Sequence, residues 1–371
     1  MGKPLGLYLH FPFCAKKCAY CDFPSYAGEM ALREPYTKAL IREIAERGEG
    51  LGRPEADTVY LGGGTPSLMQ PEQMAAALSQ LRDSFSLVPD AEISCEANPG
   101  TLSERFLRTL KEQGVNRLSL GAQSADGEEL TRLGRMHSWD KVIQTLNLAR
   151  AAGFDNISLD LMTGLPGQDW DKLRATLDAA IALSPTHLSC YSLIIEEGTP
   201  FYSEQEALGL PDEETERGLY WHTVHYLAQA GYQQYEISNF ARPGFECRHN
   251  RNCWKRSEYL GFGAAAAGFY GGVRRRNALR LREYLAGTGP ETETVTALDA
   301  RFESLMLGLR LTKGLSLEGF KAMHGLEARE AWPEALRRHV DAGMMEERKG
   351  YLRLTRQGLD LMDRLLLDFL P

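Results

Sequence analysis

An alternation of short apolar segments with longer amphipathic ones runs through residues 5–240 and leaves few folds open. The apolar segments predict β-strands at 6–11, 57–63, 91–97, 115–123, 156–162 and 187–193. The amphipathic segments predict helices at 31–47, 71–85, 103–113, 138–152, 169–183 and 212–230. Six such repeats predict an α/β protein with a parallel sheet, either an open doubly wound sheet or part of a barrel.

Five motifs rich in glycine and polar residues lie at or just beyond the ends of these strands. They read CAKKCAYC, GGGTP, EANP, GAQS and DLMTGLPGQ. In parallel α/β folds the chemistry gathers at the carboxyl ends of the strands. We therefore expect the functional site at this edge of the sheet.

The chain divides by composition into three expected parts. Residues 1–240 form the α/β core, 241–295 a glycine-rich connection, and 296–371 a small C-terminal module. The module predicts helices and a hairpin at 301–310, 316–323, 328–341, MEERKGYLRLT and 355–369. This order resembles a winged helix, but its acidic residues offset its basic ones, so a packing or lid role is favoured over DNA binding.

The charge and the opening residues limit the partners and the location. A net charge of -8 argues against nucleic acid, because phosphate binding depends on clustered Lys and Arg. The opening segment LGLYLHFPF is too short for a signal peptide, and no run approaches the roughly 18 apolar residues of a membrane helix. The sequence therefore predicts a cytoplasmic protein.

The seven cysteines are too few for a disulfide scaffold, so the question is which of them are ligands. Cys95 and Cys190 lie in predicted strands, where a small buried apolar role is expected. Cys14, Cys18 and Cys21 instead share one loop with the spacing C-x3-C-x2-C. These three are the candidate metal ligands.

Three thiolates can hold a [4Fe-4S] cluster and leave the fourth iron open to an exchangeable ligand. The alternative, a zinc site, needs a fourth Cys or His close by. His10 precedes the loop but lies on the predicted strand. The loop therefore predicts a cluster with an open iron.

The cysteine loop, with Tyr20 before its last cysteine, resembles that of the radical S-adenosylmethionine (SAM) superfamily. GGGTP at residues 62–66 adds to this resemblance, because glycines let the backbone approach the methionine part of SAM closely. The resemblance implies that SAM chelates the open iron. An electron from the cluster can then cleave a carbon–sulfur bond and release a 5′-deoxyadenosyl radical, which is chemistry of the cofactor.

The whole chain resembles the family of oxygen-independent coproporphyrinogen III oxidase (HemN) and its relative, the heme chaperone HemW. The matching segments are LYLHFPFC, GGGTP, EISCEANP, NRLSLGAQS, LGRMHS, SLDLMTGLPGQ and FARPG. This resemblance implies a partial (β/α)6 radical SAM barrel with a small C-terminal winged-helix-like α+β module. Carried over to matching positions, it implies a SAM pocket of Tyr8, Tyr20, Gly63, Gly64, Thr65, Glu96, Gln123, Arg135 and Asp160.

Three of these side chains have chemistry that suits SAM. Glu96 can accept hydrogen bonds from the ammonium group, and Asp160 can bind ribose hydroxyls or a cationic centre. Arg135 can pair with the carboxylate. Each alone would more often be structural, and their shared placement at strand ends favours the binding role.

Two departures separate the chain from the oxidase branch. The oxidase has a further cysteine two residues after its cluster motif, where this sequence has Phe23. It also has an extension before the cluster strand, whereas this sequence begins seven residues before Tyr8. Both features are tied to propionate decarboxylation, so that activity is not expected here.

The segment RHNRNCW, 248–254, resembles the His-Asn-x-x-Tyr-Trp motif of the heme chaperones, with Cys253 in place of tyrosine. A neutral imidazole suits heme iron, so His249 is the expected axial ligand, and Trp254 could stack on the porphyrin. The alternative is a loop histidine that bonds to the backbone. Cys247 and Cys253 flank His249 without forming the C-x-x-C-H attachment pattern.

Two further groups are weaker candidates. His222 and His225 share one face of a predicted helix, yet no third ligand accompanies them, so core or surface roles are favoured. The run 274–276 of three arginines could pair with heme propionates, but a solvated hairpin tip is favoured.

Two functional hypotheses remain. In the first, the chain is a carrier that binds heme and passes it to an acceptor protein, with the cluster and SAM controlling transfer or dimer formation. In the second, it is an enzyme whose radical acts on a tetrapyrrole or another substrate in decarboxylation, methyl transfer or heme opening. Both need an electron donor such as flavodoxin or ferredoxin. A homodimer and peripheral contact with a membrane are compatible with either hypothesis.

Overall fold

The computed structural model describes residues 5–371. Six parallel strands occur where the sequence predicted them: β1 (Leu5–Phe11), β4 (Glu55–Gly63), β5 (Ser86–Ala97), β6 (Arg117–Gln123), β7 (Asn156–Thr163) and β8 (His187–Ser192). The intervening helices are α1 (Arg33–Gly50), α2 (Pro71–Ser84), α3 (Glu104–Glu112), α5 (Trp139–Ala151) and α6 (Trp170–Ala182), with α8 (Glu213–Gln229) after β8. The predicted α/β core is confirmed.

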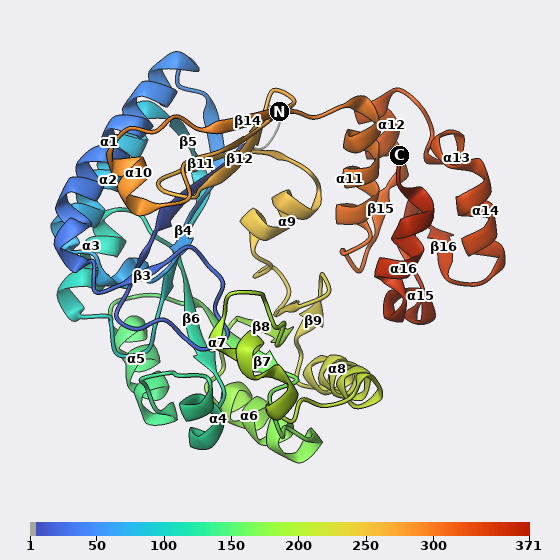
Figure 1. The fold of residues 1–371 in the computed structure, drawn as a ribbon, viewed down its shortest axis with the longest axis horizontal. Coiled ribbons are helices and arrows are strands. Elements are labelled where there is room, and N and C mark those ends of the chain that lie inside the picture. The colour runs from blue at the N-terminus through green and yellow to red at the C-terminus, as the bar shows by residue number, and fades with distance from the viewer. Residues whose placement is uncertain (1–4) are drawn as a thin grey trace.

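The order of the strands decides between the two predicted architectures. Neighbours in the sheet run β1-β4-β5-β6-β7-β8, so each crossover moves to the next strand in the same direction. Because such crossovers share one hand, all their helices cover the same face of the sheet. Figure 1 shows the helices from α1 to α6 along the outside of an arc of strands. The fold is a partial barrel rather than a doubly wound sheet.

Alternation along the strands gives this barrel an unusual interior. Leu7, Leu9, Val59 and Leu61 point outward and pack with the helices in one apolar core. Their neighbours Tyr8, His10, Thr58, Tyr60, Glu96, Arg117, Ser119, Ser158, Asp160 and His187 belong to the opposite, inner face. The inner face is therefore polar and can serve as a binding surface.

The sheet is wider than the sequence predicted. On one side β10 (Asn239–Ala241) and β9 (Gln233–Gln234) continue it in antiparallel sense beyond β8. On the other side β11 (Glu258–Phe262) pairs in parallel with β1 and is followed by β12 (Ala267–Tyr270), β13 (Val273–Arg276) and β14 (Glu291–Thr294). The segment 241–295, for which the sequence predicted only a glycine-rich connection, thus contributes four strands. It also contains α9 (Arg248–Trp254) and α10 (Leu281–Leu285).

The C-terminal module has its own apolar core of residues such as Leu305, Phe320, Leu336 and Phe369. It consists of α11 (Ala297–Gly308), α12 (Leu317–His324), α13 (Ala328–Ala331), α14 (Pro333–Asp341), α15 (Arg356–Asp360) and α16 (Met362–Leu366), with a sheet of β15 (Leu315–Ser316), β16 (Met345–Arg348) and β17 (Tyr351–Leu354). Helix 328–341, predicted as continuous, is broken at Trp332. Pro333 explains the break, because proline disfavours helical backbone in the residue before it.

The module packs beside α9 on the open side of the arc (Figure 1). Arg256 pairs with Glu303 at 2.8 Å, and the Arg310 guanidinium lies 5.3 Å from the centre of the Trp254 ring. No helix within residues 5–371 has the length and apolar character needed to cross a membrane.

Candidate functional site

The three clustered cysteines lie in a loop that two short strands close. β2 (Phe13–Cys14) pairs with β3 (Tyr26–Ala27), and Ala19 N donates to Leu133 O at 3.1 Å. All three thiols are free and half-buried. Burial raises the pKa of Cys21 to about 11, and the charges of Cys18 and Cys14 act in the same direction. The three thiols thus belong to one closed loop, as a shared cluster requires.

Tyr20 anchors the same loop from the protein side. It packs in a small apolar cluster with Leu133, Leu165 and Phe201, where α7 (Pro200–Glu204) begins. Phe201 N donates to Ala19 O at 3.0 Å. Burial raises the pKa of the Tyr20 phenol, which therefore keeps its proton.

His10 does not supply a fourth ligand for zinc. Its Nε2 lies 2.8 Å from Pro24 O, which can only accept, so Nε2 carries the proton. Nδ1 is then free to accept from Tyr8 OH at 2.9 Å. Burial lowers the pKa of His10, in keeping with a neutral ring. Within residues 5–371 no three His, Cys, Asp or Glu side chains are arranged to hold a single metal ion, an arrangement that a [4Fe-4S] cluster does not need because each thiolate binds a different iron.

The glycines of GGGTP allow the cysteine loop to lie against the end of β4. A Cβ on Gly63 would lie 2.4 Å from the His10 ring, and φ there is +110°. A Cβ on Gly64 would lie 2.8 Å from Phe13 O, and Gly64 N donates to Phe11 O at 2.9 Å. In this structure the two glycines therefore allow one part of the protein to approach another closely.

Gly63→Ala should lower the free energy of unfolding by roughly 2–5 kcal/mol, because the left-handed backbone and the clash with His10 both oppose a side chain. Gly167→Ala is the matched control: φ is +69°, and nothing lies within 4 Å of the added carbon. It should cost only about 1–2 kcal/mol. Equilibrium urea unfolding of both variants measures the difference, and equal losses would remove the packing argument.

The two carboxylates of the predicted SAM pocket lie on the inner face of the barrel. Glu96 accepts from Tyr60 OH at 2.9 Å and from Gly63 N at 3.2 Å. Burial, and the charge of Asp160, raise its pKa to about 7. Asp160 accepts from Ser119 Oγ at 2.9 Å, and burial raises its pKa as well. A bound cation would favour the ionised form of either group.

Gln123 has the strained backbone and the unpaired atom expected of a binding residue. It ends β6 at φ +66°, beside a shift in the pairing with β7. Its side chain is buried, and Oε1 has no hydrogen-bond partner among the described residues. Backbone strain of this kind clusters at functional sites. A buried oxygen without a partner can accept a hydrogen bond from a bound ligand.

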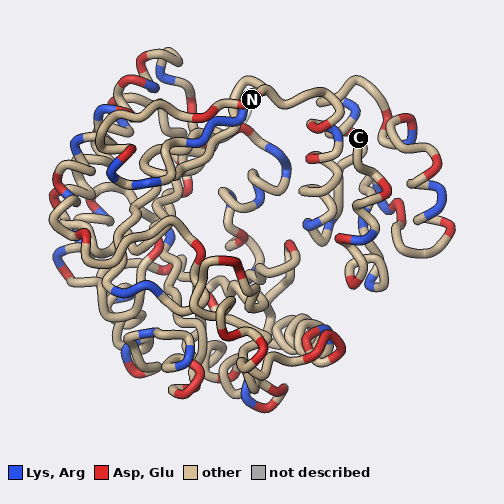
Figure 2. Tube along the Cα trace, in the orientation of Figure 1, with Lys and Arg blue, Asp and Glu red and all other residues tan. Residues whose placement is uncertain are grey.

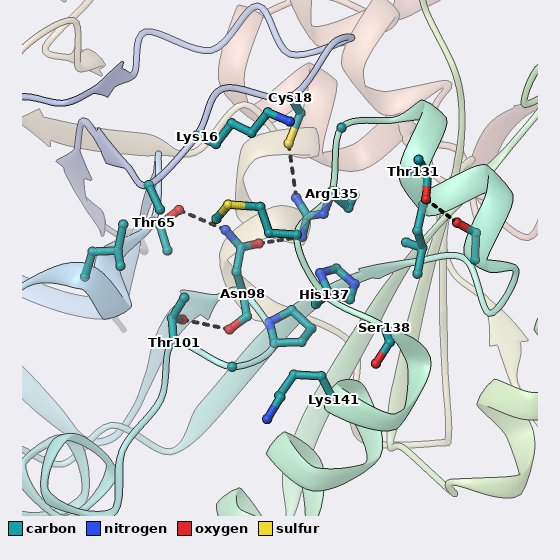
Figure 3. Close-up of a pocket in the computed structure, with 18 residues that line it drawn as sticks. Lys16, Cys18, Thr65, Asn98, Thr101, Thr131, Arg135, His137, Ser138 and Lys141 are labelled. Atoms are coloured by element: carbon teal, nitrogen blue, oxygen red, sulfur yellow. Dashed lines mark hydrogen bonds between the residues drawn. The ribbon is translucent and has the colours of Figure 1, made fainter.

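Arg135 connects the cysteine loop to the end of β5. Its guanidinium lies 3.6 Å from Cys18 Sγ and donates at 2.6 Å to both Asn98 Oδ1 and Gly121 O. Asn98 Nδ2 in turn donates to Thr65 Oγ1 at 2.9 Å, and that oxygen lies 3.7 Å from Cys14 Sγ. Figure 3 shows Arg135 between Cys18 and Asn98, at the wall of a cavity of about 720 Å³.

The structure therefore adds Asn98 and Tyr60 to the residues singled out from the sequence. Asn98 lies in EANP, a motif recognised at a strand end without a role for this residue. Tyr60 is an ordinary tyrosine within a strand, and only the fold reveals its contact with Glu96. Of the SAM candidates, Gly63, Gly64, Thr65, Glu96 and Gln123 lie at or just beyond the carboxyl ends of strands, and Tyr8 and Asp160 lie within strands on the inner face. Tyr20 lies in the cysteine loop, and Arg135 lies in the connection between α4 (Gly127–Arg132) and α5.

His249 lies inside the molecule rather than in an exposed loop. It is 6% exposed on α9, and its Nδ1 is 3.0 Å from Thr58 Oγ1. Glu92 holds the start of α9 by accepting from Arg248 N at 3.0 Å and from His249 N at 3.1 Å. Burial, and the charge of Arg117, lower the pKa of His249 to about 4, so its ring is neutral.

An aromatic stack connects His249 to the carboxylate at the end of β5. The ring centroid of Tyr60 is 5.2 Å from that of His249 and 6.4 Å from that of Tyr8. Both pairs are close to parallel, at 27° and 26°. Tyr60 thus touches His249 with its ring and Glu96 with its hydroxyl.

The other sequence candidates have structural contacts. His222 packs on Trp170 at 5.0 Å, and His225 Nδ1 lies 2.6 Å from Trp221 O. Cys95 and Cys190 are buried. Arg274 pairs with Glu293 and Glu303, and Arg276 pairs with Glu291 at 2.6 Å. Cys247 Sγ lies 3.5 Å from Glu92 Oε1, and Cys253 is half-buried.

Comparisons with family models and with known proteins point to the same family. The family model of the radical SAM superfamily matches residues 8–180, and that of the HemN C-terminal domain matches 295–361. The chain is 37% identical to heme chaperone HemW of Bacillus subtilis (strain 168) over 95% of both chains. It is also 37% identical to heme chaperone HemW of Escherichia coli (strain K12), over 99% of this chain and 98% of the relative.

A solved structure shares the whole architecture. Coproporphyrinogen III oxidase (HemN) from Escherichia coli, described as a radical SAM enzyme, superposes with a TM-score of 0.86 at 25% identity. The superposition covers 99% of this chain and 90% of the oxidase. The chain therefore belongs to the radical SAM superfamily and, within it, to the family of the heme chaperone HemW.

Proposed function

We propose that the chain is a heme chaperone that binds heme as cargo and delivers it to an acceptor protein. The observation that carries this proposal is the placement of His249 in a chain whose relatives of nearly full length are named heme chaperones. Its imidazole is neutral, and Nδ1 is tied to Thr58. When Nδ1 donates to Thr58, Nε2 is unprotonated and its lone pair is available to a metal. This is the usual state of an imidazole that ligates a metal.

Heme ligation by His249 carries a structural condition. Because the side chain is 6% exposed, α9 must shift from β4 before Nε2 can reach an iron. Hydrogen bonds to Thr58, Glu92 and Asp57, the last from Asn252 Nδ2 at 3.0 Å, hold the helix in place. Trp254 also has Arg310 over its ring, so stacking on a porphyrin requires the C-terminal module to give way.

We propose that Cys14, Cys18 and Cys21 hold a [4Fe-4S] cluster and that SAM occupies the carboxyl end of the barrel. When bound, SAM and the reduced cluster supply one-electron chemistry. Glu96 binds the ammonium group, Arg135 pairs with the carboxylate, and Asp160 faces the ribose or the sulfonium. Gly63, Gly64 and Thr65 border the methionine part, and Gln123 supplies its unpaired oxygen. Tyr8 and Tyr20 line the pocket.

The stack of Tyr8, Tyr60 and His249 supports a controlling role for SAM. A ligand at Glu96 changes the partner of the Tyr60 hydroxyl, and the Tyr60 ring rests on His249. SAM binding and the position of α9 are thereby linked through one side chain. Such coupling is reciprocal, so heme should change SAM affinity by the factor by which SAM changes heme affinity.

The competing function is oxidative decarboxylation of coproporphyrinogen III, which the resemblance to HemN favours. Phe23, where the oxidase has cysteine, is 60% exposed and offers no thiol or proton donor. The reduced, cluster-loaded protein, incubated without oxygen with SAM and coproporphyrinogen III, should therefore yield no protoporphyrinogen. Chromatography of the porphyrins after oxidation measures the result, and product formed over several turnovers would overturn the carrier proposal.

The partners follow from the same proposal. Heme and an acceptor protein are required by the chaperone role, and a donor such as flavodoxin or ferredoxin by the cluster. We place this function in the cytoplasm. A homodimer, and contact with the surface of a membrane at the point of delivery, are further proposals that depend on the acceptor.

A further inference from the structure

The cavity beside Cys18 has a charge that contrasts with the rest of the molecule. Its wall includes Lys16, Arg135, His137 and Lys141 but no aspartate or glutamate. The whole chain carries 50 acidic and 42 basic residues, and Figure 2 shows both signs mixed over the outer helices. The charged side chains of this cavity wall are all basic, whereas the chain as a whole is acidic. The cavity therefore favours an anionic ligand or partner.

Two of the cations are free to meet such a partner. In the proposed function Arg135 is taken up by the SAM carboxylate, and it also contacts Cys18, Asn98 and Gly121, so it is not available to a second anion. Burial together with Arg135 lowers the pKa of His137 to about 4, so that its ring is neutral. Lys16 and Lys141 are exposed, and neither forms an ion pair with a carboxylate of the described residues. Lys141 donates only to Gln144 Oε1, at 2.8 Å.

The two lysines come from different elements and lie on the same cavity as a cluster thiol. Lys16 belongs to the cysteine loop, Lys141 to the first turn of α5, and Cys18 lines the cavity with them (Figure 3). Met136, also in the wall, is 67% exposed. An exposed apolar side chain beside basic ones is typical of a transient protein contact.

We propose that this cavity and its rim, defined by Lys16, Cys18, Met136 and Lys141, form the docking surface for an acidic one-electron donor protein. The inference rests on the cluster of the proposed function. Electron transfer weakens steeply with distance, so the donor must approach where a cluster ligand borders an open cavity, and Cys18 is the cluster cysteine in the wall of this cavity. Redox encounters use small interfaces, and their rates depend on complementary charge.

The electron balance is simple. A flavodoxin in its hydroquinone form loses one electron and becomes the semiquinone, while the cluster passes from the 2+ to the 1+ state. No covalent bond forms or breaks. The lysines attract the acidic donor and orient it, and they leave the chemistry of the cluster unchanged.

The test is the rate at which reduced flavodoxin reduces the cluster in the full-length, cluster-loaded protein, followed by stopped-flow absorbance. Replacing both lysines, Lys16→Glu with Lys141→Glu, should slow the second-order rate at low salt by about tenfold or more. Added salt should shrink the difference, because it screens charges beyond about 10 Å. The double variant Lys38→Glu with Lys321→Glu makes the same change of net charge on α1 and α12 and should keep the rate within about twofold.

A second reductant separates docking from exposure of the cluster. The methyl viologen radical cation needs no acidic docking partner, so the lysine variant should not slow its reaction. An equal slowing with methyl viologen, an equal slowing in the control variant, or an unchanged rate with flavodoxin would each overturn the proposal. Dithionite, a small anion, distinguishes attraction of any anion from docking of a protein. If the lysine variant slows reduction by dithionite as much as reduction by flavodoxin, the docking proposal is also contradicted.

Cluster content, measured before mixing, separates this inference from the function on which it rests. Wild-type protein that holds no cluster after reconstitution contradicts the proposed function itself. If the double variant loses the cluster while the wild type keeps it, the single variant Lys141→Glu is used instead, because Lys141 lies outside the cysteine loop. That single variant should still slow the flavodoxin reaction by about threefold or more, and an unchanged rate would overturn the docking surface.

Discussion

Cys18→Ser should abolish the iron–sulfur cluster, leaving protein with little iron, little sulfide and no brown absorbance after anaerobic reconstitution. The loop supplies three thiols, and His10, the nearest imidazole in sequence, has both ring nitrogens engaged. Two thiolates and a hydroxyl cannot hold four irons, because clusters of this kind depend on thiolate ligands. Cys14→Ser and Cys21→Ser should give the same result.

Cys253→Ser is the matched control for this loss. Cys253 is also free and half-buried, but it lies on α9, far along the chain from the loop. Its replacement should leave iron and sulfide at the wild-type level, with an unchanged circular dichroism spectrum in all variants. Full cluster content in Cys18→Ser, or its loss in Cys253→Ser, would show that the ligands are assigned wrongly.

The sequence predicted the core of the fold because its signals are local. Each of the six strands is a short apolar run, the helices are amphipathic, and several of them end near a glycine such as Gly114 or Gly153. Motifs that follow consecutive parallel strands must meet at one edge, so Cys18, Thr65 and Arg135 could be expected near one another. The structure brings these three side chains together around Asn98.

What could not be predicted depends on contacts between distant parts of the chain. β11 pairs with β1 across about 250 residues, and its glycine-rich surroundings hide the strand pattern. Gly261 and Gly268 are there because the backbones approach closely: a Cβ on Gly261 would clash with Ala267 O. In a sequence, such glycines predict irregular structure, whereas in this sheet they allow the close approach of the strands.

The position of His249 is the clearest case of the same limit. RHNRNCW contains no apolar period that would place α9 against the inner face of the barrel. The helix is held there by Thr58, Tyr60 and Glu92, which are separated from it by more than 150 residues. A residue type can be assigned from sequence, but its burial comes from partners that the local pattern does not name.

His249→Ala should weaken heme binding by more than about tenfold and change the absorption spectrum of the bound heme, because the iron loses its axial imidazole. Thr58→Val keeps the imidazole but removes the hydrogen-bond partner of Nδ1. It should also weaken heme binding, but less than His249→Ala does. His225→Ala, a replacement of an exposed histidine that bonds to the backbone of its own helix, should bind heme like the wild type.

Added imidazole distinguishes a lost ligand from a damaged fold. It should restore the spectrum of the His249→Ala complex, since a free imidazole can occupy the vacated position on the iron. A variant that had merely lost the packing of α9 would gain nothing from it. Equilibrium unfolding of the same preparations checks that the variant is folded during the titration.

The measurement that decides the account is therefore the heme titration of cluster-loaded protein, run in parallel on wild type and His249→Ala. A carrier with His249 as the axial ligand predicts saturable binding in the wild type and weak, spectrally altered binding in the variant, restored in spectrum by imidazole. The same affinity and the same spectrum in both proteins would contradict it, and so would wild-type protein that does not bind heme.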